Sequence, residues 1–303
     1  MKTDIKLGYT CNNNCIHCVI ADQRQKALIF RGNQDRSTQE YINELIESKK
    51  NGCDQVVFTG GEPTLRKDLF DLLTAATNMG FRIGIQTNGR MFFYQDFCQN
   101  FKKYNIHFVI AIHGSTAQIH DKIVRVNNSF KQTIEGIKNL KKIDKTITGK
   151  VVISKINFKD LKNIAQLFKN LNVNNINFAF PHAEGNARKN FDLVVPKYSE
   201  IELYVHETAQ FCKDNNIKVN FETFPFCFMK GFEELISELR FVNKKNSELK
   251  QLDGNTKNWE IVRKKIKAKF KQCNLCKHNN ICEGVWKEYP EKFGNSEFKP
   301  ITD

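Results

Sequence analysis

Apolar runs of strand length alternate with helical apolar patterns through the first two thirds of the sequence. The strand-like runs are rich in Val, Ile and Phe, and amphipathic stretches separate them. The strand-like segments are Asp4–Tyr9, Gln55–Thr59, Phe81–Gln86, Ile106–Ile112, Lys150–Ile156 and Asn175–Phe180, and the helical ones are Ser37–Asn51, Asp68–Met79, Tyr94–Tyr104, Ser129–Lys142, Asp160–Leu171 and Tyr198–Asn215. Successive β-α units predict a parallel α/β sheet, open or curved into a barrel, with ligands at the carboxyl ends of the strands.

The pattern changes after about residue 217. A short apolar run, Ile217–Phe221, is followed by a charged stretch of helical pattern, Gly231–Val242, and by a basic amphipathic segment, Trp259–Phe270. We therefore expect a β/α core over residues 1–216 and a small subdomain over residues 217–303. With few apolar residues to build its own core, the subdomain would be held together by metal.

Length and composition indicate a globular chain of one large domain with a small appendage, or of two modest domains, since 40% of its 303 residues are hydrophobic. No apolar run approaches the roughly 20 residues that a membrane span needs, and the first residues lack the apolar core of a signal peptide. We therefore expect a cytoplasmic protein without a membrane contact.

The net charge of +14 would attract an anionic partner, such as RNA, an acidic peptide or a phosphorylated small molecule, without choosing among them. An AT-rich genome that favours Lys and Asn codons explains the charge equally well. The segment Trp259–Phe270 is the place where RNA or an acidic leader peptide would bind, although a solvated helix that packs one face on the subdomain is the favoured interpretation.

Ten cysteines in a reducing compartment point to metal rather than disulfides. Three of them, Cys11, Cys15 and Cys18, stand within eight residues directly after the first strand. Three thiolates on one short loop hold three corners of an iron–sulfur cube and leave the fourth iron open. The alternative is a zinc site closed by His17, which would have to fold back sharply beside Cys18.

The spacing Cys-x3-Cys-x2-Cys, with His17 before the last Cys, resembles the signature of the radical S-adenosylmethionine (radical SAM) superfamily. The motif Gly60-Gly61-Glu62-Pro63 after the second strand is similar to a second motif of that family. The resemblance implies a (β/α)6 part-barrel of the TIM type over roughly residues 4–215. It implies a [4Fe–4S] cluster on the three cysteines, with S-adenosylmethionine (SAM) on the fourth iron and its ammonium group against the second motif.

The activity that the resemblance implies follows from this cluster. One electron from the reduced cluster breaks the S–C5′ bond of SAM, and the resulting 5′-deoxyadenosyl radical removes a hydrogen atom from a substrate. The family contacts the ribose or the carboxylate of SAM from the remaining strand ends, where Asn88, His113 and Ser154 are the candidates. The stretch His113–Phe130 also resembles a pattern of the superfamily, and Arg125 within it is a candidate bidentate donor to the carboxylate. Each has an ordinary alternative, namely a turn Asn, a hydrogen-bonded His, a strand-end Ser and a solvated Arg. No side chain stands out as catalytic.

A second group of cysteines, Cys273-x2-Cys276-x5-Cys282, lies near the end of the chain, and Cys227 could complete a set of four. This spacing is similar to the SPASM and twitch extensions of radical SAM enzymes. It departs from SPASM because no Cys follows Cys282 and Trp stands at position 286. The resemblance implies one auxiliary [4Fe–4S] cluster; the alternative is a zinc knuckle with His278. Cys53, Cys98 and Cys212 are expected to be buried packing residues.

The function that we expect is radical modification, by crosslinking or epimerisation, of a ribosomally made peptide or protein, with an electron donor such as flavodoxin or ferredoxin. Because only ten residues precede Cys11, a leader peptide would bind the barrel or the C-terminal subdomain. A small molecule in cofactor biosynthesis, or RNA, is the alternative substrate. A non-catalytic zinc- and RNA-binding protein is the alternative from another class, but it leaves Gly60–Pro63 unexplained.

Overall fold

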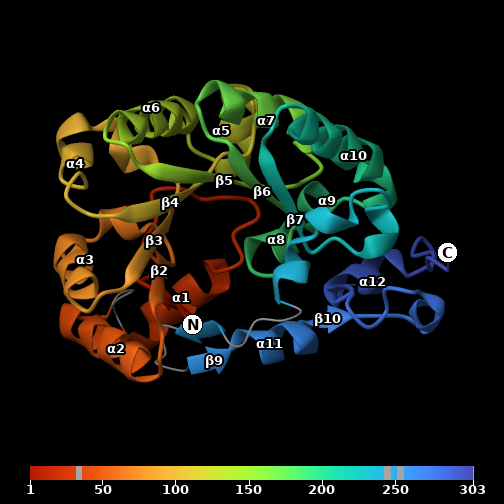
Figure 1. Cartoon of the computed structure of the whole chain (residues 1–303), viewed down its shortest axis with the longest axis horizontal. Coiled ribbons are helices and arrows are strands. Elements are labelled where there is room, and N and C mark those ends of the chain that lie inside the picture. The colour runs from red at the N-terminus through yellow and green to blue at the C-terminus, as the bar shows by residue number, and fades with distance from the viewer. Residues whose placement is uncertain (32–35, 242–246, 251–255, 303) are drawn as a thin grey trace.

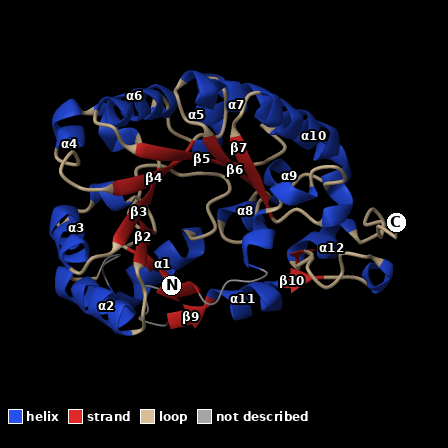
Figure 2. Cartoon of the chain, in the orientation of Figure 1, coloured by secondary structure: helices blue, strands red, loops and turns tan. Residues whose placement is uncertain are grey.

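The computed structural model describes residues 1–31, 36–241, 247–250 and 256–302. A single curved sheet forms its centre, with helices on the convex side (Figures 1 and 2). The order of the strands is β7-β6-β5-β4-β3-β2-β1-β8-β9. The strands are β1 (Lys2–Lys6), β2 (Gln55–Thr59), β3 (Arg82–Thr87), β4 (Ile106–Ala111), β5 (Thr146–Val152), β6 (Asn175–Ala179), β7 (Lys218–Glu222), β8 (Ser247–Lys250) and β9 (Thr256–Asn258).

Neighbouring strands from β7 to β1 are parallel, as the β-α alternation predicts. β8 pairs with β1 in parallel and β9 is antiparallel to β8. In the part of the chain that the structure describes, β7 and β9 stand at opposite ends of this order and do not pair with each other, so the sheet is an open part-barrel and the predicted fold class is confirmed.

Helices follow the strands, and most of them cover the outside of the sheet, whereas the first one lies on its concave side (Figure 2). They are α1 (Ala21–Arg31), α2 (Thr38–Lys50), α3 (Leu69–Asn78), α4 (Gln95–Gln99), α5 (Ala117–Val124), α6 (Ser129–Lys142), α7 (Leu161–Asn170), α8 (Asn186–Lys189), α9 (Phe191–Val194) and α10 (Tyr198–Asp214). The sequence predicts the start of α2 well: Ser37 accepts a hydrogen bond from the backbone of Glu40, whose carboxylate accepts one from Ser37 in return.

The core lies between the sheet and these helices. Every second residue of a strand points toward the helices, so Ile176 and Phe178 of β6 are fully buried while Asn177 faces the concave side. Aromatic rings fill the layer beneath α4 and α6: Phe92, Phe101 and Phe108 have ring centroids 5.1–5.8 Å apart. The expectation that Cys53, Cys98 and Cys212 are buried is confirmed.

Three of the predicted helices differ in the structure. The segment Tyr94–Tyr104 contains only the short α4, after a 3₁₀ turn at Arg90–Phe93. The segment Gly231–Val242 forms 3₁₀ turns at Glu233–Leu235 and Ser237–Phe241, because Ile236 makes a β-bridge to Phe221 that a helix would forbid. Of Gly231–Val242, residue 242 lies outside the described residues.

The third difference is the basic segment Trp259–Phe270. Its helix, α11 (Trp259–Ile266), ends early because β10 (Lys267–Ala268) pairs in antiparallel fashion with β11 (Val285–Trp286). The last helix of the described residues, α12 (Glu288–Phe293), lies beside α9 (Figure 1). Tyr289 and Phe298 pack against Tyr198 of α10, with ring centroids 5.0 and 5.8 Å from the Tyr198 ring.

β7 continues the parallel sheet beyond residue 216, and the division of the chain between residues 216 and 217 stays a prediction. Within the described ranges, no helix has both the length and the apolar character that crossing a membrane requires.

Candidate active site

Two glycines place the chain that leads to the first cysteine. Gly61 N–H donates to Gly8 O (2.9 Å), and Glu62 N–H donates to Thr10 O (2.8 Å). A Cβ on Gly60 would lie 2.4 Å from Gly8 O, and one on Gly61 would lie 2.2 Å from Thr10 O. Only glycine permits this approach, so the motif after β2 fixes the backbone that runs into Cys11.

The carboxylate of Glu62 is buried and accepts hydrogen bonds from neighbouring groups of the chain. Its Oε1 accepts hydrogen bonds from the Thr64 backbone (3.1 Å), the Thr64 hydroxyl (2.6 Å) and the Thr87 hydroxyl (2.6 Å), and its Oε2 accepts one from Asn88 N–H (2.7 Å). Burial raises the pKa of Glu62, and these hydrogen bonds act against that rise. The carboxylate therefore ties the end of β2 to the end of β3, and the buried Pro63 begins a 3₁₀ turn beside it.

Cys11, Cys15 and Cys18 lie on the loop between β1 and α1, each partly exposed. In Figure 1 this loop, in red, runs along the concave side of the sheet before α1. The end of α5 holds it: Asn14 N–H donates to Val124 O and Ile16 N–H donates to Ile123 O, both at 3.0 Å.

Residues from distant parts of the chain complete the support of this loop. Asn186 donates from its backbone to Cys18 O (2.9 Å) and from its side chain to Cys15 O (3.0 Å). A Cβ on Gly185, which has a φ of +56°, would lie 2.5 Å from Cys18 O. Arg90 donates to Asn13 Oδ1 (2.8 Å), and Asn88 donates to Asn12 Oδ1 (2.7 Å). No motif in the sequence predicts that Arg90 and Asn186 support the cysteine loop. Their positions after β3 and β6 are the sequence feature that could have indicated this role.

The structure brings His17 and His113 together. Their rings meet edge to face with centroids 4.5 Å apart, and His113 is buried. The Nδ1 atom of His113 accepts a hydrogen bond from Val152 N–H (3.2 Å), which leaves the ring proton on Nε2. His113 is thus fixed at the end of β4, next to the cysteine loop.

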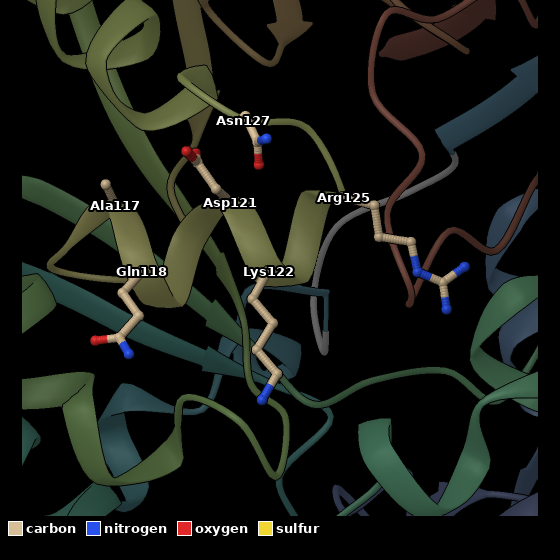
Figure 3. Close-up of a pocket in the computed structure, with 6 residues that line it drawn as sticks. All are labelled: Ala117, Gln118, Asp121, Lys122, Arg125 and Asn127. Carbon is tan, nitrogen blue, oxygen red and sulfur yellow. The ribbon is translucent and has the colours of Figure 1, made fainter.

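Ser154 and Arg125 have partners within the protein. The fully buried Ser154 donates from its hydroxyl to Asn157 Oδ1 (3.1 Å), within a turn after β5. Arg125 is exposed at the end of α5 and donates to Asn190 Oδ1 (2.9 Å). It borders a surface pocket of about 540 Å³ along α5, and Figure 3 shows it extending away from Gln118 and Asp121.

Polar side chains line the concave face between β5 and β7. The Nζ atom of Lys150 donates to Asn177 Oδ1 (2.6 Å) and forms an ion pair with Glu222. Asn177 in turn donates to Asn220 Oδ1 (2.5 Å). The charge of Lys150 lowers the pKa of Glu222. Amide, ammonium and carboxylate groups of β5, β6 and β7 thus face the concave side of the sheet.

The Lys150–Glu222 pair makes a prediction about pH. A carboxyl group whose pKa is lowered by folding stabilises the folded state above its ordinary pKa, and that contribution is lost as the pH falls. We expect the free energy of unfolding, measured in urea, to fall more between about pH 6 and pH 2 in the native chain than in Glu222→Gln, because the loss takes place below the ordinary pKa of a glutamate. Glu234→Gln, which removes the pair with Lys213, is the control and should change this slope less, because Lys213 is the one charge among the described residues that lowers the pKa of Glu234, whereas Lys150, Lys267 and Arg263 all lower that of Glu222. Equal slopes in native chain and Glu222→Gln would contradict the prediction.

The four cysteines of the C-terminal region line one largely apolar pocket. Cys227 lies in a 3₁₀ turn after β7, and Cys273, Cys276 and Cys282 follow β10. The rings of Phe226, Phe270 and Phe298 line the pocket together with the four cysteines. Burial raises the pKa of Cys227 to about 12, and the neighbouring Cys282 and Cys273 thiolates add to the rise.

The distances between sulfur atoms test which metal group fits these two sets. Within the described residues, no three cysteine sulfurs lie within 4.8 Å of one another. Four thiolates around one zinc ion, with bonds of about 2.3 Å at tetrahedral angles, would be about 3.8 Å apart. An iron–sulfur cube binds each thiolate at a separate iron and needs wider spacing. Among the residues that the structure describes, neither set is therefore gathered around a point where a single ion would sit.

The residues 5–168 match the model of the Radical SAM superfamily, and the chain belongs to this superfamily. Membership implies SAM and a SAM-binding [4Fe–4S] cluster, so the sequence-based assignment to the family is confirmed. The relatives in this superfamily are enzymes with names such as synthase and cyclase.

Two relatives illustrate the range of activities. An AdoMet-dependent heme synthase of Oleidesulfovibrio alaskensis is 30% identical over 162 residues, which cover 54% of this chain and 40% of the relative. A PqqA peptide cyclase of Rhodopseudomonas palustris is 26% identical over 198 residues, 65% of this chain and 51% of the relative. The chain thus spans only about two fifths to half of the length of these relatives.

Solved structures share the fold over nearly the whole chain. Streptococcus suis SuiB bound to the precursor peptide SuiA has a TM-score of 0.68 at 16% identity, covering 99% of this chain and 75% of SuiB. The enzyme anSMEcpe with bound AdoMet and the Cp18Cys peptide has a TM-score of 0.68 at 15% identity, covering 100% of this chain and 92% of that one. At these identities the likeness shows the fold alone.

Proposed function

We propose that this chain binds a [4Fe–4S] cluster through Cys11, Cys15 and Cys18, cleaves SAM, and modifies a peptide or protein. The observation that carries the proposal is the cysteine loop itself, which the glycines after β2 and Asn186 after β6 hold at the carboxyl ends of the strands. When bound, the cluster and SAM supply a 5′-deoxyadenosyl radical that abstracts a hydrogen atom.

The chain's own residues have distinct parts in this proposal. Gly60 and Gly61 let the backbone approach closely, while Glu62 and Pro63 keep the turn rigid. The side chains that surround or support the cofactor are His17, Asn88, His113, Arg125 and Ser154. Of these, His17 lies in the cysteine loop and contacts His113, and Asn88 donates to Asn12 of the same loop, whereas Ser154 and Arg125 bond to Asn157 and Asn190.

An auxiliary [4Fe–4S] cluster on Cys227, Cys273, Cys276 and Cys282 belongs to the same proposal, in a SPASM- or twitch-like subdomain. The shared pocket and the spacing of the sulfurs support it. Four thiolates would ligate the cluster fully, so electron relay or structural support suits it better than substrate coordination. A reductant such as flavodoxin or ferredoxin would supply the electrons.

A peptide or protein is the substrate that the concave face suits best. Asn177, Asn220 and Lys150 present donors and acceptors, which match the N–H and C=O groups of a peptide. The PqqA peptide cyclase and the peptide-bound SuiB and anSMEcpe structures point in the same direction. The heme synthase relative favours a small molecule as the second candidate. Family membership favours an enzyme over a zinc- and RNA-binding protein, and RNA is not favoured as a substrate.

The test is an anaerobic iron and sulfide count together with dithionite-driven formation of 5′-deoxyadenosine. The native chain should hold about eight irons, and a Cys11/Cys15/Cys18→Ala variant about four, with nucleoside formed only by the native chain. Cys98→Ala, at a buried cysteine away from both sets, is the control and should keep all eight. Zinc in place of iron, or no cleavage of SAM by the native chain, would refute the proposal.

The substrate needs its own measurement. Short peptides encoded beside the gene, porphyrin precursors and bulk tRNA should each be incubated with reduced enzyme and SAM, and their masses compared. A mass change in a peptide alone supports the peptide assignment. A change in a porphyrin precursor would move the assignment to the small-molecule candidate.

A further inference from the structure

We propose that His182, Glu184 and Glu288 form a divalent-cation site, separate from the cysteines, that joins the loop after β6 to the first turn of α12. The Nε2 atom of His182 lies 3.8 Å from Glu184 Oε1 and 3.5 Å from Glu288 Oε2. All three ligand atoms lie within 4.8 Å of one another. Ligands about 2.1 Å from a tetrahedral ion are about 3.4 Å apart, so small side-chain adjustments suffice to place a cation between them.

Two of these ligand atoms are buried without a partner. His182 Nε2 and Glu288 Oε2 have almost no accessible surface and accept or donate no hydrogen bond among the residues that the structure describes. Their separation of 3.5 Å is too long for a strong hydrogen bond between them. A buried carboxylate oxygen facing an unpaired imidazole nitrogen is costly, and a cation between them would satisfy both.

The surrounding structure aims the side chains at one point. The ring of His182 stacks on Trp286 with centroids 4.0 Å apart and an interplanar angle of 16°, which fixes its direction. Glu184 N–H donates to His182 O (2.9 Å), and this tight turn folds Glu184 back toward the imidazole. Burial acts to raise the pKa of Glu288, but His182, its own backbone and, least of all, the charge of Arg188 lower it.

The ligand set selects the class of cation. One imidazole and two carboxylates carry a charge of −2 and offer one nitrogen and oxygen donors, which suit zinc, manganese or ferrous iron rather than a thiolate-bound cluster. Three protein ligands leave a coordination position open for water or a substrate group.

A cation here would connect two parts of the molecule. His182 and Glu184 precede Gly185 and Asn186, which hold the cysteine loop, whereas Glu288 belongs to the C-terminal region. Occupancy of the site would therefore fasten α12 to the segment that supports Cys15 and Cys18.

Manganese is the probe, because it prefers oxygen and nitrogen donors and avoids thiolates. Protein with its clusters assembled, passed over a chelating resin under nitrogen, is titrated with Mn²⁺, and free Mn²⁺ is followed by electron paramagnetic resonance. We expect one Mn²⁺ per chain, displaced by Zn²⁺. Glu288→Gln and His182→Gln should each weaken binding on the order of 100-fold or more, since even groups behind the ligands contribute 10- to 100-fold.

Glu291→Gln changes an exposed carboxylate on the same helix and is the matched control; it should bind like the native chain. Zn²⁺ should also raise the thermal midpoint of the native chain and of Glu291→Gln, but not of Glu288→Gln. If Glu288→Gln fails to fold, Glu184→Gln, at a half-exposed position, tests the same prediction. Absence of binding at millimolar Mn²⁺, or equal binding by native chain and variants, would overturn the proposal. The readout does not depend on SAM cleavage.

Discussion

Replacing Gly61 with alanine is expected to reduce the formation of 5′-deoxyadenosine by about 100-fold or more. The added Cβ would lie 2.2 Å from Thr10 O and 2.6 Å from the carbonyl carbon of Tyr9. These are backbone atoms, so no rotamer change relieves the overlap, and the chain must shift where it enters Cys11. A displacement of about 1 Å at a reacting centre costs about 100-fold in rate. Nucleoside formed with dithionite, together with bound iron, measures the effect.

Gly84→Ala is the matched control for this substitution. Gly84 lies on β3, and a Cβ there would meet the Val57 Cγ2 atom at 3.1 Å and His107 O only at 3.7 Å. The Val57 side chain can turn slightly, so we expect activity within a few-fold of the native chain. If Gly61→Ala retained comparable activity, the glycines would not be what positions the cysteine loop.

Replacing Glu62 with alanine is expected to lower the free energy of unfolding by about 3 kcal/mol or more. The substitution leaves the backbone N–H groups of Thr64 and Asn88, and the Thr87 hydroxyl, buried without their acceptor. Each buried donor that loses its partner costs about 1–3 kcal/mol. Urea unfolding of the cluster-free protein measures the loss.

Glu62→Gln separates the structural part of this residue from any contact with SAM. Its amide oxygen can keep the hydrogen bonds at Oε1, and only the one from Asn88 N–H is lost, so its unfolding free energy should fall by about 1 kcal/mol. Equilibrium binding of SAM to the cluster-loaded protein is the second measurement. Affinity within a few-fold of native would mean that Glu62 only holds the turn, whereas a larger loss would assign it to the ammonium group. Equal destabilisation by both substitutions would contradict the hydrogen-bond account.

The parts of the site that could be predicted from the sequence are those formed by residues close together in the chain. The three cysteines and Gly60–Pro63 occupy single loops after β1 and β2, and strand periodicity places both loops at one edge of the sheet. The sequence also predicts that Cys227 joins the three cysteines later in the chain, because a metal group with four protein ligands needs one more thiolate than those three. The structure places all four cysteines in one pocket.

The residues that hold the cysteine loop could not be predicted in this way. Asn186 and Arg90 are ordinary loop residues in the sequence, and their hydrogen bonds to the loop depend on how β3 and β6 are placed by the curvature of the sheet. The same holds for Ile236, whose bridge to β7 replaces a helix that the local charge pattern favours. Local periodicity carries no information about such pairings.

The hydrogen bond from Asn186 to Cys15 O spans 171 positions along the sequence, and this has a consequence for the order of assembly. During synthesis the three cysteines emerge first, yet the segment that completes their support emerges only after β6. Closing so long a loop costs entropy that is recovered only when the intervening β-α units are in place. Iron–sulfur loading is therefore expected to follow folding of the sheet, and a chain truncated before Asn186 would present the thiols without the frame that retains a cluster.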